Sequence, residues 1–327
     1  MLSQVASITR QATRRPEDTL NILTGDCHPS YQSNQAMTGD SYFSLPHKTF
    51  TAWNTQYRPI PNNYQQLKDS YPLDVDFDIV LSHHKFSMFQ LMEPLARKNN
   101  IPFISLEHTL PMTGWHPSYL KQWTDNRGDL NVFISDYSVE KWGYDRSDPT
   151  VRVIKHGINT DLFCPANVEK KNRILCVVND WKVRNAECNF DGFLRTASDL
   201  PCLILGNTPG VSKPADSVES LISEYQSSRI FYNTSLISPV PMSVMEAMAC
   251  GCAIVTTGTC MLPEIIQNGV NGFISNDEKE LRGYLEMLLS DEKLATELGN
   301  NARKTILERY SLQQFVDSWN KIFRELL

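Results

Sequence analysis

Apolar and β-branched runs alternate along the chain with longer segments whose apolar residues recur at helical spacing. In the first half the runs occupy residues 20–25, 76–84, 101–108 and 130–135, and residues 86–100 have the helical pattern. The runs are almost continuously apolar, as strands covered on both faces are. The pattern therefore predicts a parallel sheet with helices on both faces.

The same alternation starts again at Arg173, after an expected last strand and exit loop at 151–165 and a polar hinge at 166–172. We predict two Rossmann-like doubly wound α/β domains that face each other across a cleft. The expected N-terminal, acceptor-binding domain covers 1–160 and the nucleotide-sugar-binding domain 161–310, while the helix in 311–327 packs back toward the N-terminal domain. Further strands are expected at 173–180, 201–207, 229–235 and 252–258, and helices near 185–198, 278–289, 291–309 and 312–326.

Ligands of doubly wound sheets bind beyond the carboxyl ends of the strands. This rule selects the loops that follow residues 24, 82, 106, 178, 206, 235 and 256. Gly25 and Asp26 after the first strand, and Gly206 and Asn207 in the second half, are therefore candidate binding residues.

The stretch 235–273 is the most informative part of the sequence. Its segment Ser243–Ala249 is predicted to form a short helix, preceded by Pro241, whose missing N–H costs nothing at a helix start. The free amides of such a start bind anions, and a diphosphate is a common occupant. Glu246 lies one turn further in, where a carboxylate is repelled by phosphate unless it points toward hydroxyl groups such as those of a ribose.

The segment EAMACGCAIVTTGTCMLPEIIQNGVNGF, residues 246–273, resembles the donor-site region of the retaining family-4 glycosyltransferases of GT-B fold. DFDIVLSHH, IPFISLEHT and VIKHGINTDLFCP resemble the family more weakly, and residues 1–19 are not covered. The resemblance implies that Glu246 binds the nucleotide ribose and that amides near Met242, Ser243 and Val244 hold the distal phosphate. It also implies transfer without a metal and with retention of configuration.

One departure from the family is Ser238, which stands where the family has a first glutamate, seven residues before the second. That carboxylate contacts hydroxyls of the donor sugar, so the identity of the sugar stays open. Backbone N–H groups around Val240 and Met242 are alternative contacts for the sugar. A short connection between 207 and 229 leaves uridine and guanosine both open as the base.

Cationic groups are expected beside the leaving diphosphate, where charge develops in the transition state. The family supplies an Arg and a Lys after the first strand of the second domain, and this chain offers Lys182 and Arg184 there; a solvated helix start is the alternative. His108 matches a position near the reaction centre of the family, although a hydrogen-bonded core histidine is equally compatible. We rank His28 and His83 lower, and Glu264 recurs in the family but also suits a helix start.

Residues 38–67 are rich in aromatic residues, Asn and Pro, and are predicted to contain the acceptor loops. Trp53, Tyr57 and Arg58 are candidates for stacking on a sugar or a base. The simpler alternative for each of them is that it anchors a long loop.

Composition excludes several other classes of protein. The net charge is −6, the eight cysteines contain no CxxC pair, and no histidine spacing fits a metal site. We expect no metal and no cofactor, with the nucleotide-sugar serving as co-substrate. No apolar stretch is long enough to cross a membrane, and the first 19 residues lack a secretory pattern, so a cytoplasmic location without stable membrane insertion is expected.

The leading hypothesis is a hexosyl- or pentosyltransferase that uses a UDP- or GDP-linked sugar. Its hydroxyl acceptor is open and includes a glycan, a small molecule or modified DNA. One alternative is a transferase acting on a hydroxylated DNA base, favoured by Lys48, Arg58 and Arg127 but opposed by the net charge. Others are a nucleotide-sugar-binding protein with impaired catalysis, motivated by Ser238, and, ranked last, a GT-B epimerase or phosphorylase.

Overall fold

The computed structural model of the chain describes residues 9, 12–15, 17–55, 58–68, 75–112 and 114–327. It divides into two compact units: unit 1 contains residues up to Gly157 together with Gln313–Leu327, and unit 2 is Ile158–Leu312. The boundaries expected from the sequence, after 160 and after 310, lie close to these. Each unit is built on one parallel sheet.

Unit 1 has a seven-stranded sheet in the order β3-β2-β1-β4-β5-β6-β7, and all of the paired strands are parallel. The order reverses at β1, whose neighbours are β2 and β4. The strands are β1 (Asn21–Gly25), β2 (Ser41–Leu45), β3 (Tyr64–Gln66), β4 (Ile79–Ser82), β5 (Phe103–Glu107), β6 (Leu130–Phe133) and β7 (Val151–Val153). The helical elements of this part of the chain are α2 (Pro29–Gln35), the 3₁₀ turn η1 (Ala36–Thr38), α3 (Ser87–Asn99), α4 (Pro117–Thr124) and α5 (Asp136–Lys141).

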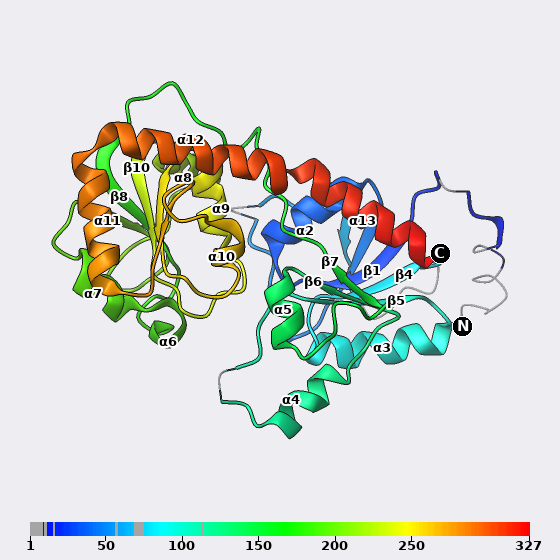
Figure 1. Ribbon diagram of the computed structural model, residues 1–327. Helices are drawn as coiled ribbons and strands as arrows, with labels where there is room; N and C mark the ends of the chain where they lie inside the picture. The colour runs from blue at the N-terminus through cyan, green and yellow to red at the C-terminus, as the bar shows by residue number, and fades with distance from the viewer. Residues whose placement is uncertain (1–8, 10–11, 16, 56–57, 69–74, 113) are drawn as a thin grey trace. The chain divides into compact units, whose positions relative to one another are not determined.

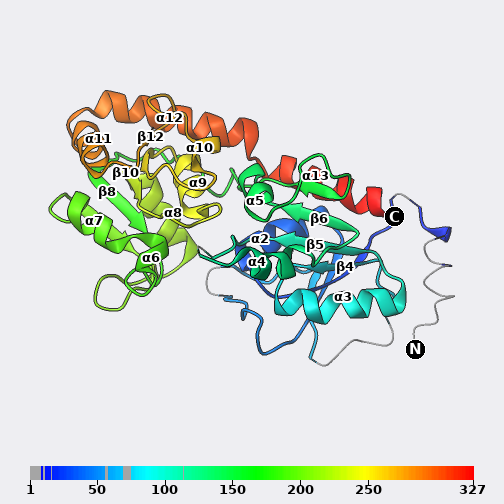
Figure 2. The ribbon, with the colours of Figure 1, turned by 60° about the horizontal axis from the view of Figure 1, so that its bottom comes forward.

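The final helix, α13 (Leu312–Leu326), covers the face of the unit 1 sheet on which α2 lies, while α3 covers the opposite face (Figures 1 and 2). Its apolar side carries Phe315 and Trp319, both buried. The Trp319 indole N–H donates to the hydroxyl of Tyr31 in α2 at 3.1 Å, and the ring of Phe315 meets that of Tyr31 edge-on. These contacts join the chain's last helix to the helix that follows β1.

Unit 2 has a five-stranded parallel sheet in the order β12-β11-β10-β8-β9. Helices α7 and α11 lie on one face and α8 and α9 on the other (Figures 1 and 2). The strands are β8 (Lys171–Val177), β9 (Cys202–Leu205), β10 (Ser228–Asn233), β11 (Ala253–Thr256) and β12 (Phe273–Ile274). The helices are α6 (Asn185–Cys188), α7 (Phe190–Ala197), α8 (Val218–Ser227), α9 (Met242–Ala249), α10 (Leu262–Ile265), α11 (Glu278–Ser290) and α12 (Glu292–Arg309).

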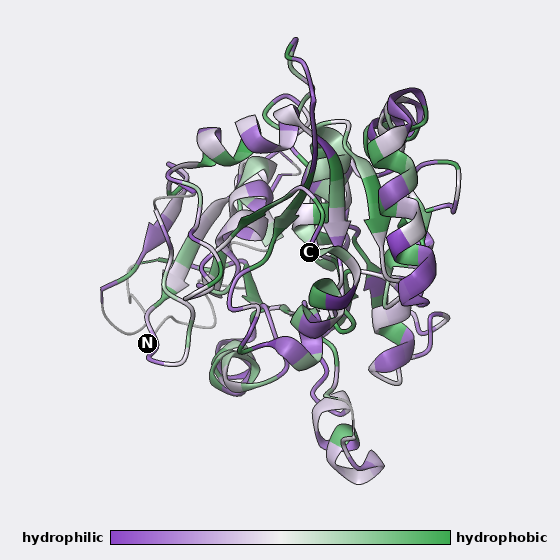
Figure 3. Ribbon diagram, turned by 90° about the vertical axis from the view of Figure 1, so that its left-hand side faces the viewer, coloured by the Kyte–Doolittle hydropathy of each residue, from purple (hydrophilic) through white to green (hydrophobic). Residues whose placement is uncertain are grey.

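The hydropathy pattern explains both layers. Apolar residues concentrate on the strands, while the helices carry apolar and polar residues together (Figure 3). The prediction of two parallel sheets covered by helices is confirmed. Two expectations were wrong in detail: residues 38–67, expected as loops, also contain β2 and β3, and the helix expected near 185–198 is broken at Asn189, which has a left-handed backbone (φ 54°).

Candidate functional site

In the unit 2 sheet the strand order reverses at β8: the chain places β9 on one side of β8 and then β10 on the other. The connections after β8 and β10 therefore leave their strands at the place where doubly wound sheets bind ligands. Both connections carry predicted site residues: Lys182 and Arg184 follow β8, while Ser238 and the start of α9 follow β10.

Main-chain hydrogen bonds hold these two connections together. The backbone N–H groups of Leu236 and Ile237 both donate to the carbonyl of Glu187 in α6, at 2.7 and 3.0 Å. The carbonyl of Cys188 accepts from the Thr234 hydroxyl and from the Trp181 indole N–H, each at 2.8 Å. The loop before α9 is thus fixed to the loop after β8.

Helix α9 begins at Met242, one residue before the predicted start, with Pro241 as its N-cap. No side chain caps its first turn, and the amide of Val244 bonds to the Pro241 carbonyl at 3.1 Å. The amide of Val244 is thus already used within the helix, and its predicted contact with a phosphate stays a prediction. The amides of Met242 and Ser243 precede the first hydrogen-bonded turn, and both residues are half-buried.

Glu246 is buried, with 7% of its surface exposed. The other residues of α9 are apolar or small, so Glu246 is its one charged side chain. Its Oε2 accepts a hydrogen bond from the hydroxyl of Tyr225 in α8 at 3.1 Å. A carboxylate accepts several hydrogen bonds at once, so this bond is compatible with further bonds to ribose hydroxyls. The lone glutamate on a buried helix face is the feature that an apolar core would not select.

Ser238 lies half-buried in the loop between β10 and α9. The base of this loop is held from the neighbouring strand, because the hydroxyls of Thr257 and Thr259 both donate to the Ser235 carbonyl, at 2.5 and 2.8 Å. Ser238 therefore stands on a supported loop, and its predicted contact with the donor sugar stays a prediction.

Gly206 and Asn207 follow β9 and bind the loop after β8. Gly206 has φ +121°, and a Cβ there would lie 2.1 Å from the Val178 carbonyl oxygen, so only glycine fits. The backbone N–H of Asn207 donates to Asn179 Oδ1 at 2.8 Å, and the backbone carbonyl of Asn207 accepts the Asp180 N–H at 2.9 Å. These two residues thus shape the loops, with the Asn207 side chain exposed.

The predicted cations Lys182 and Arg184 are both exposed and lie in the turn just before α6. The ammonium of Lys182 is 5.8 Å from the centre of the Phe190 ring, and Arg184 is the N-cap residue of α6. Their exposure fits a solvated helix start and a phosphate contact equally, so their role stays a prediction.

In unit 1 the corresponding reversal of strand order is at β1, which has β2 on one side and β4 on the other. Gly25 ends β1, and the Phe50 ring packs so closely that a Cβ at Gly25 would be 2.5 Å from it. Asp26 accepts hydrogen bonds from the Tyr64 hydroxyl, at 2.8 Å, and from the Gln66 amide. Both oxygens of Asp26 therefore hold β3, which gives it a structural task in addition to the predicted binding role.

His108 directly follows β5 and lies beside His83, which follows β4. His83 Nδ1 is 3.0 Å from His108 Nε2, and the two ring planes are 5° from parallel. Burial lowers the pKa of both imidazoles well below 6.5, so both are neutral at physiological pH. Tyr31 supports His108 from the side, with ring centres 4.4 Å apart.

Three residues that lie at these two candidate sites were not identified from the sequence. Tyr225 and Gln32 are buried polar side chains in α8 and α2, helices that were not predicted from the sequence, and Tyr31 is buried beside the histidines. No spacing marks them, because their roles depend on which elements the fold brings together. A tyrosine on the apolar face of α8 was the one available signal.

The aromatic candidates in the loop region behave as anchors where the structure describes them. Trp53 is buried, donates its indole N–H to the Arg58 carbonyl at 2.7 Å and packs on Tyr64, so the loop-anchoring alternative is confirmed. Tyr57 lies outside the described residues.

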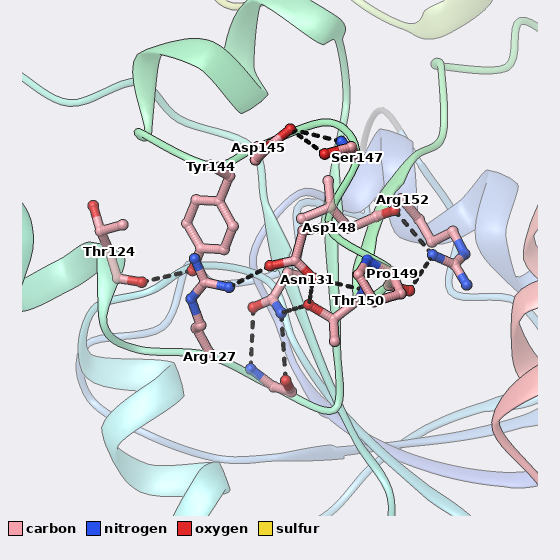
Figure 4. Close-up of polar contacts among 12 residues, drawn as sticks. Thr124, Arg127, Asn131, Tyr144, Asp145, Ser147, Asp148, Pro149, Thr150 and Arg152 are labelled. Carbon is pink, nitrogen blue, oxygen red and sulfur yellow. Dashed lines mark hydrogen bonds and ion pairs between the residues drawn. The ribbon is translucent and has the colours of Figure 1, made fainter.

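Among the basic residues proposed for DNA, Arg127 makes contacts within its own unit. Arg127 donates to Asp148 at 2.6 Å and lies over the Tyr144 ring at 4.3 Å, as the close-up of this cluster shows (Figure 4). Asp148 also accepts from the Thr150 hydroxyl and amide, and these bonds together with Arg127 lower the pKa of Asp148 to about 2. Arg127 is therefore engaged within its own unit, which weakens the DNA hypothesis.

The remaining classes of site can be checked over the described part of the chain. There, no group of three or more His, Cys, Asp or Glu side chains is arranged to hold a metal ion. None of the helices described combines the length and the apolar character that a membrane span needs. All eight cysteines are free, and burial raises the pKa of the Cys27 and Cys202 thiols to about 12.

Comparison with known proteins gives a consistent result. Residues 213–305 match the model of the family described as glycosyl transferases group 1. Among curated proteins, the chain is 30% identical over 86 residues to the N-acetyl-alpha-D-glucosaminyl L-malate synthase of Bacillus anthracis, spanning 26% of this chain and 23% of that enzyme. It is 21% identical over 286 residues to the alpha-maltose-1-phosphate synthase of Mycobacterium tuberculosis, spanning 69% of this chain and 74% of that enzyme.

Solved structures resemble the fold over most of the chain. Anabaena HepE in complex with UDP has a TM-score of 0.74 at 12% identity, covering 94% of this chain and all of that one (100%). The sucrose-phosphate synthase of Thermosynechococcus elongatus has a TM-score of 0.72 at 14% identity, covering 94% and 99%. The predicted fold class is confirmed by these structures, whereas the cleft expected between the domains stays a prediction.

Proposed function

We propose that the chain transfers a sugar from a nucleoside diphosphate donor to a hydroxyl acceptor, since residues 213–305 match the group 1 glycosyltransferase model and the fold resembles that of HepE. One observation carries the proposal: α9 starts without a side-chain cap at the carboxyl end of β10, and a buried glutamate stands one turn inside it. Uncapped amides at a helix start bind phosphate, and a carboxylate beyond them binds hydroxyl groups.

In the proposed complex the amides of Met242 and Ser243 hold the distal phosphate and Glu246 holds the ribose. Tyr225 keeps the Glu246 carboxylate in place through its hydroxyl hydrogen bond. Lys182 and Arg184 offset the charge of the leaving diphosphate, since a cation aimed at developing charge stabilises the transition state. Ser238 and the amides around it meet the donor sugar in place of the family's first glutamate.

We propose UDP as the nucleotide to test first, since the HepE structures are described as complexes with UDP and with UDP-glucose. GDP stays open. We further propose that transfer needs no metal and retains the configuration at the anomeric carbon, as in the family that the sequence resembles. His108 is the residue of unit 1 proposed to meet the reacting sugar.

Thermal unfolding with a panel of UDP- and GDP-linked sugars tests the proposal. A true donor at roughly a hundred times its Kd stabilises the folded state by about 2.7 kcal/mol, which appears as a raised Tm. The donor so found should give a glycoside of unchanged anomeric configuration with a suitable alcohol, at a rate that EDTA leaves unaltered. Donor binding without transfer or donor hydrolysis across a broad acceptor panel would instead support the binding protein with impaired catalysis.

A further inference from the structure

A line of hydrogen-bonding side chains crosses three elements of unit 1. It runs from Gln32 in α2 through His83 after β4 to His108 after β5. Gln32 Nε2 is 3.3 Å from His83 Nε2, and His83 Nδ1 is 3.0 Å from His108 Nε2. Gln32 and His83 are buried with 1% and 0% exposure, while His108 is 7% exposed at the end of the line.

Gln32 sets the direction of this line. Its Oε1 accepts the backbone N–H groups of Cys27 and His28, at 2.8 and 3.0 Å, so the orientation of the amide is fixed and its nitrogen faces His83. The same nitrogen donates to the carbonyl of Gly25 and to the hydroxyl of Tyr64, each at 2.9 Å. An amide nitrogen only donates, so a hydrogen on His83 Nε2 would face a group that cannot accept it.

The position of the hydrogen on each imidazole follows. A neutral imidazole carries one hydrogen, so a bare Nε2 places the hydrogen of His83 on Nδ1. That N–H donates to His108 Nε2, and the nearly parallel ring planes suit a bond that lies in the plane of both rings. His108 then carries its own hydrogen on Nδ1, an atom for which no partner is found among the residues that the structure describes.

We propose that Gln32 and His83 are positioning residues, which hold His108 as a neutral donor whose Nδ1–H is offered to an oxygen atom of a bound sugar. The identity of that ligand rests on the proposed function, whereas the assignment of the hydrogens does not. Without the two positioning residues, His108 would exchange its hydrogen between the two ring nitrogens and present a bare nitrogen to the sugar part of the time.

Two substitutions of His83 separate this role from simple packing. His83→Asn keeps an N–H near the place of Nδ1, whereas His83→Leu fills space but donates nothing. We expect His83→Leu to lower kcat by about tenfold or more, as other losses of tautomer control do, and His83→Asn to restore most of it. If His83 only fills the core, both variants should show the same activity.

The direct experiment is nitrogen-15 NMR of the full-length protein labelled at histidine. Wild type should show His108 protonated at Nδ1 and bare at Nε2, His83→Asn should preserve that pattern, and His83→Leu should shift it toward Nε2. A hydrogen on Nε2 of His108 in wild type would overturn the inference even if every variant failed to fold. Absence of sugar transfer with a normal histidine pattern would instead contradict the proposed function alone.

Discussion

At the scale of single residues, the bond between Tyr225 and Glu246 is the contact on which the donor site depends. Tyr225→Phe removes the hydroxyl that donates to Glu246 Oε2 and leaves the ring in the core. We expect the free energy of unfolding to fall by about 1 kcal/mol and the affinity for the nucleotide to fall severalfold, because the carboxylate loses its support. Thermal unfolding and isothermal titration measure the two effects.

Tyr232→Phe is the matched control for this prediction. Tyr232 in β10 is as deeply buried in unit 2 as Tyr225 in α8, and its hydroxyl bonds to Thr196 Oγ1 at 2.7 Å. This variant should lose similar stability and keep the wild-type affinity. Equal losses of affinity in both variants would mean that Tyr225 acts only through packing.

The side chain of His84 is expected to make the stability of the protein depend on pH. Burial, and then the nearby His28, lower the pKa of His84 from 6.5 to about 4. Between these two values the unfolded chain binds a proton at His84 and the folded chain does not. Protonation of His84 therefore lowers the free energy of unfolding as the pH falls from 6.5 toward about 4.

The change His84→Asn keeps a side-chain oxygen for the Phe86 amide, which His84 Nδ1 now accepts at 3.2 Å, and cannot be protonated. Tm should fall less in this variant than in wild type between about pH 7 and about pH 5. An identical fall in both proteins would show that His84 is charged in the folded state.

Single residues also show what the sequence can and cannot predict about the site. Glu246 and Pro241 were predictable, because a carboxylate in a small apolar helix and a proline at its start are both local features. Tyr225 was not, since its task depends on α8 lying against α9, which no local pattern encodes. The bond from the Val244 amide to the Pro241 carbonyl was not predictable either, because the first bond of a helix depends on its cap geometry.

At the scale of elements, the contact between β9 and the end of β8 depends on Gly206. In Gly206→Ala the new Cβ would meet the Val178 carbonyl at 2.1 Å, at a φ of +121° that side chains rarely adopt. We expect a loss of about 2 kcal/mol or more in the unfolding free energy of unit 2, measured by denaturant titration.

The control for this variant lies on the helix α11. Gly283→Ala puts its Cβ in open space within a regular helix, so it should raise stability by about 0.5 to 1 kcal/mol. A neutral Gly206→Ala would mean that the loops after β8 and β9 are free to move apart.

Long helices with strong periodicity were predicted well, whereas two short strands were not. The helices expected at 291–309 and 312–326 differ by at most one residue from Glu292–Arg309 and Leu312–Leu326. The strands β2 and β3 were missed, because each is short and stands in a loop-like segment rich in Asn and Pro. Their pairing with β1 and with each other supplies what local propensity lacks.

At the scale of the whole molecule, two similar sheets place the candidate residues at equivalent points. Each sheet reverses its strand order once, at β1 in unit 1 and at β8 in unit 2. Gly25, Asp26 and the two histidines gather at the first point, and the loop before α9 lies at the second. The topology therefore accounts for why residues so distant in sequence belong to two compact sites, and repeated apolar alternation was enough to predict it.

The central claim is that the start of α9 and Glu246 together bind a nucleoside diphosphate, and its most direct test is calorimetry. The ligand is the nucleoside diphosphate, UDP or GDP, whose sugar-linked form stabilises the protein most, and it is titrated into wild type, Glu246→Gln and Glu297→Gln. Glu297→Gln is the control, because Glu297 is an exposed residue of α12 and its change removes the same charge elsewhere in unit 2. We predict at least about tenfold weaker binding for Glu246→Gln, about 1.4 kcal/mol, and wild-type binding for Glu297→Gln. Wild-type affinity in Glu246→Gln, with the fold intact, would contradict the account.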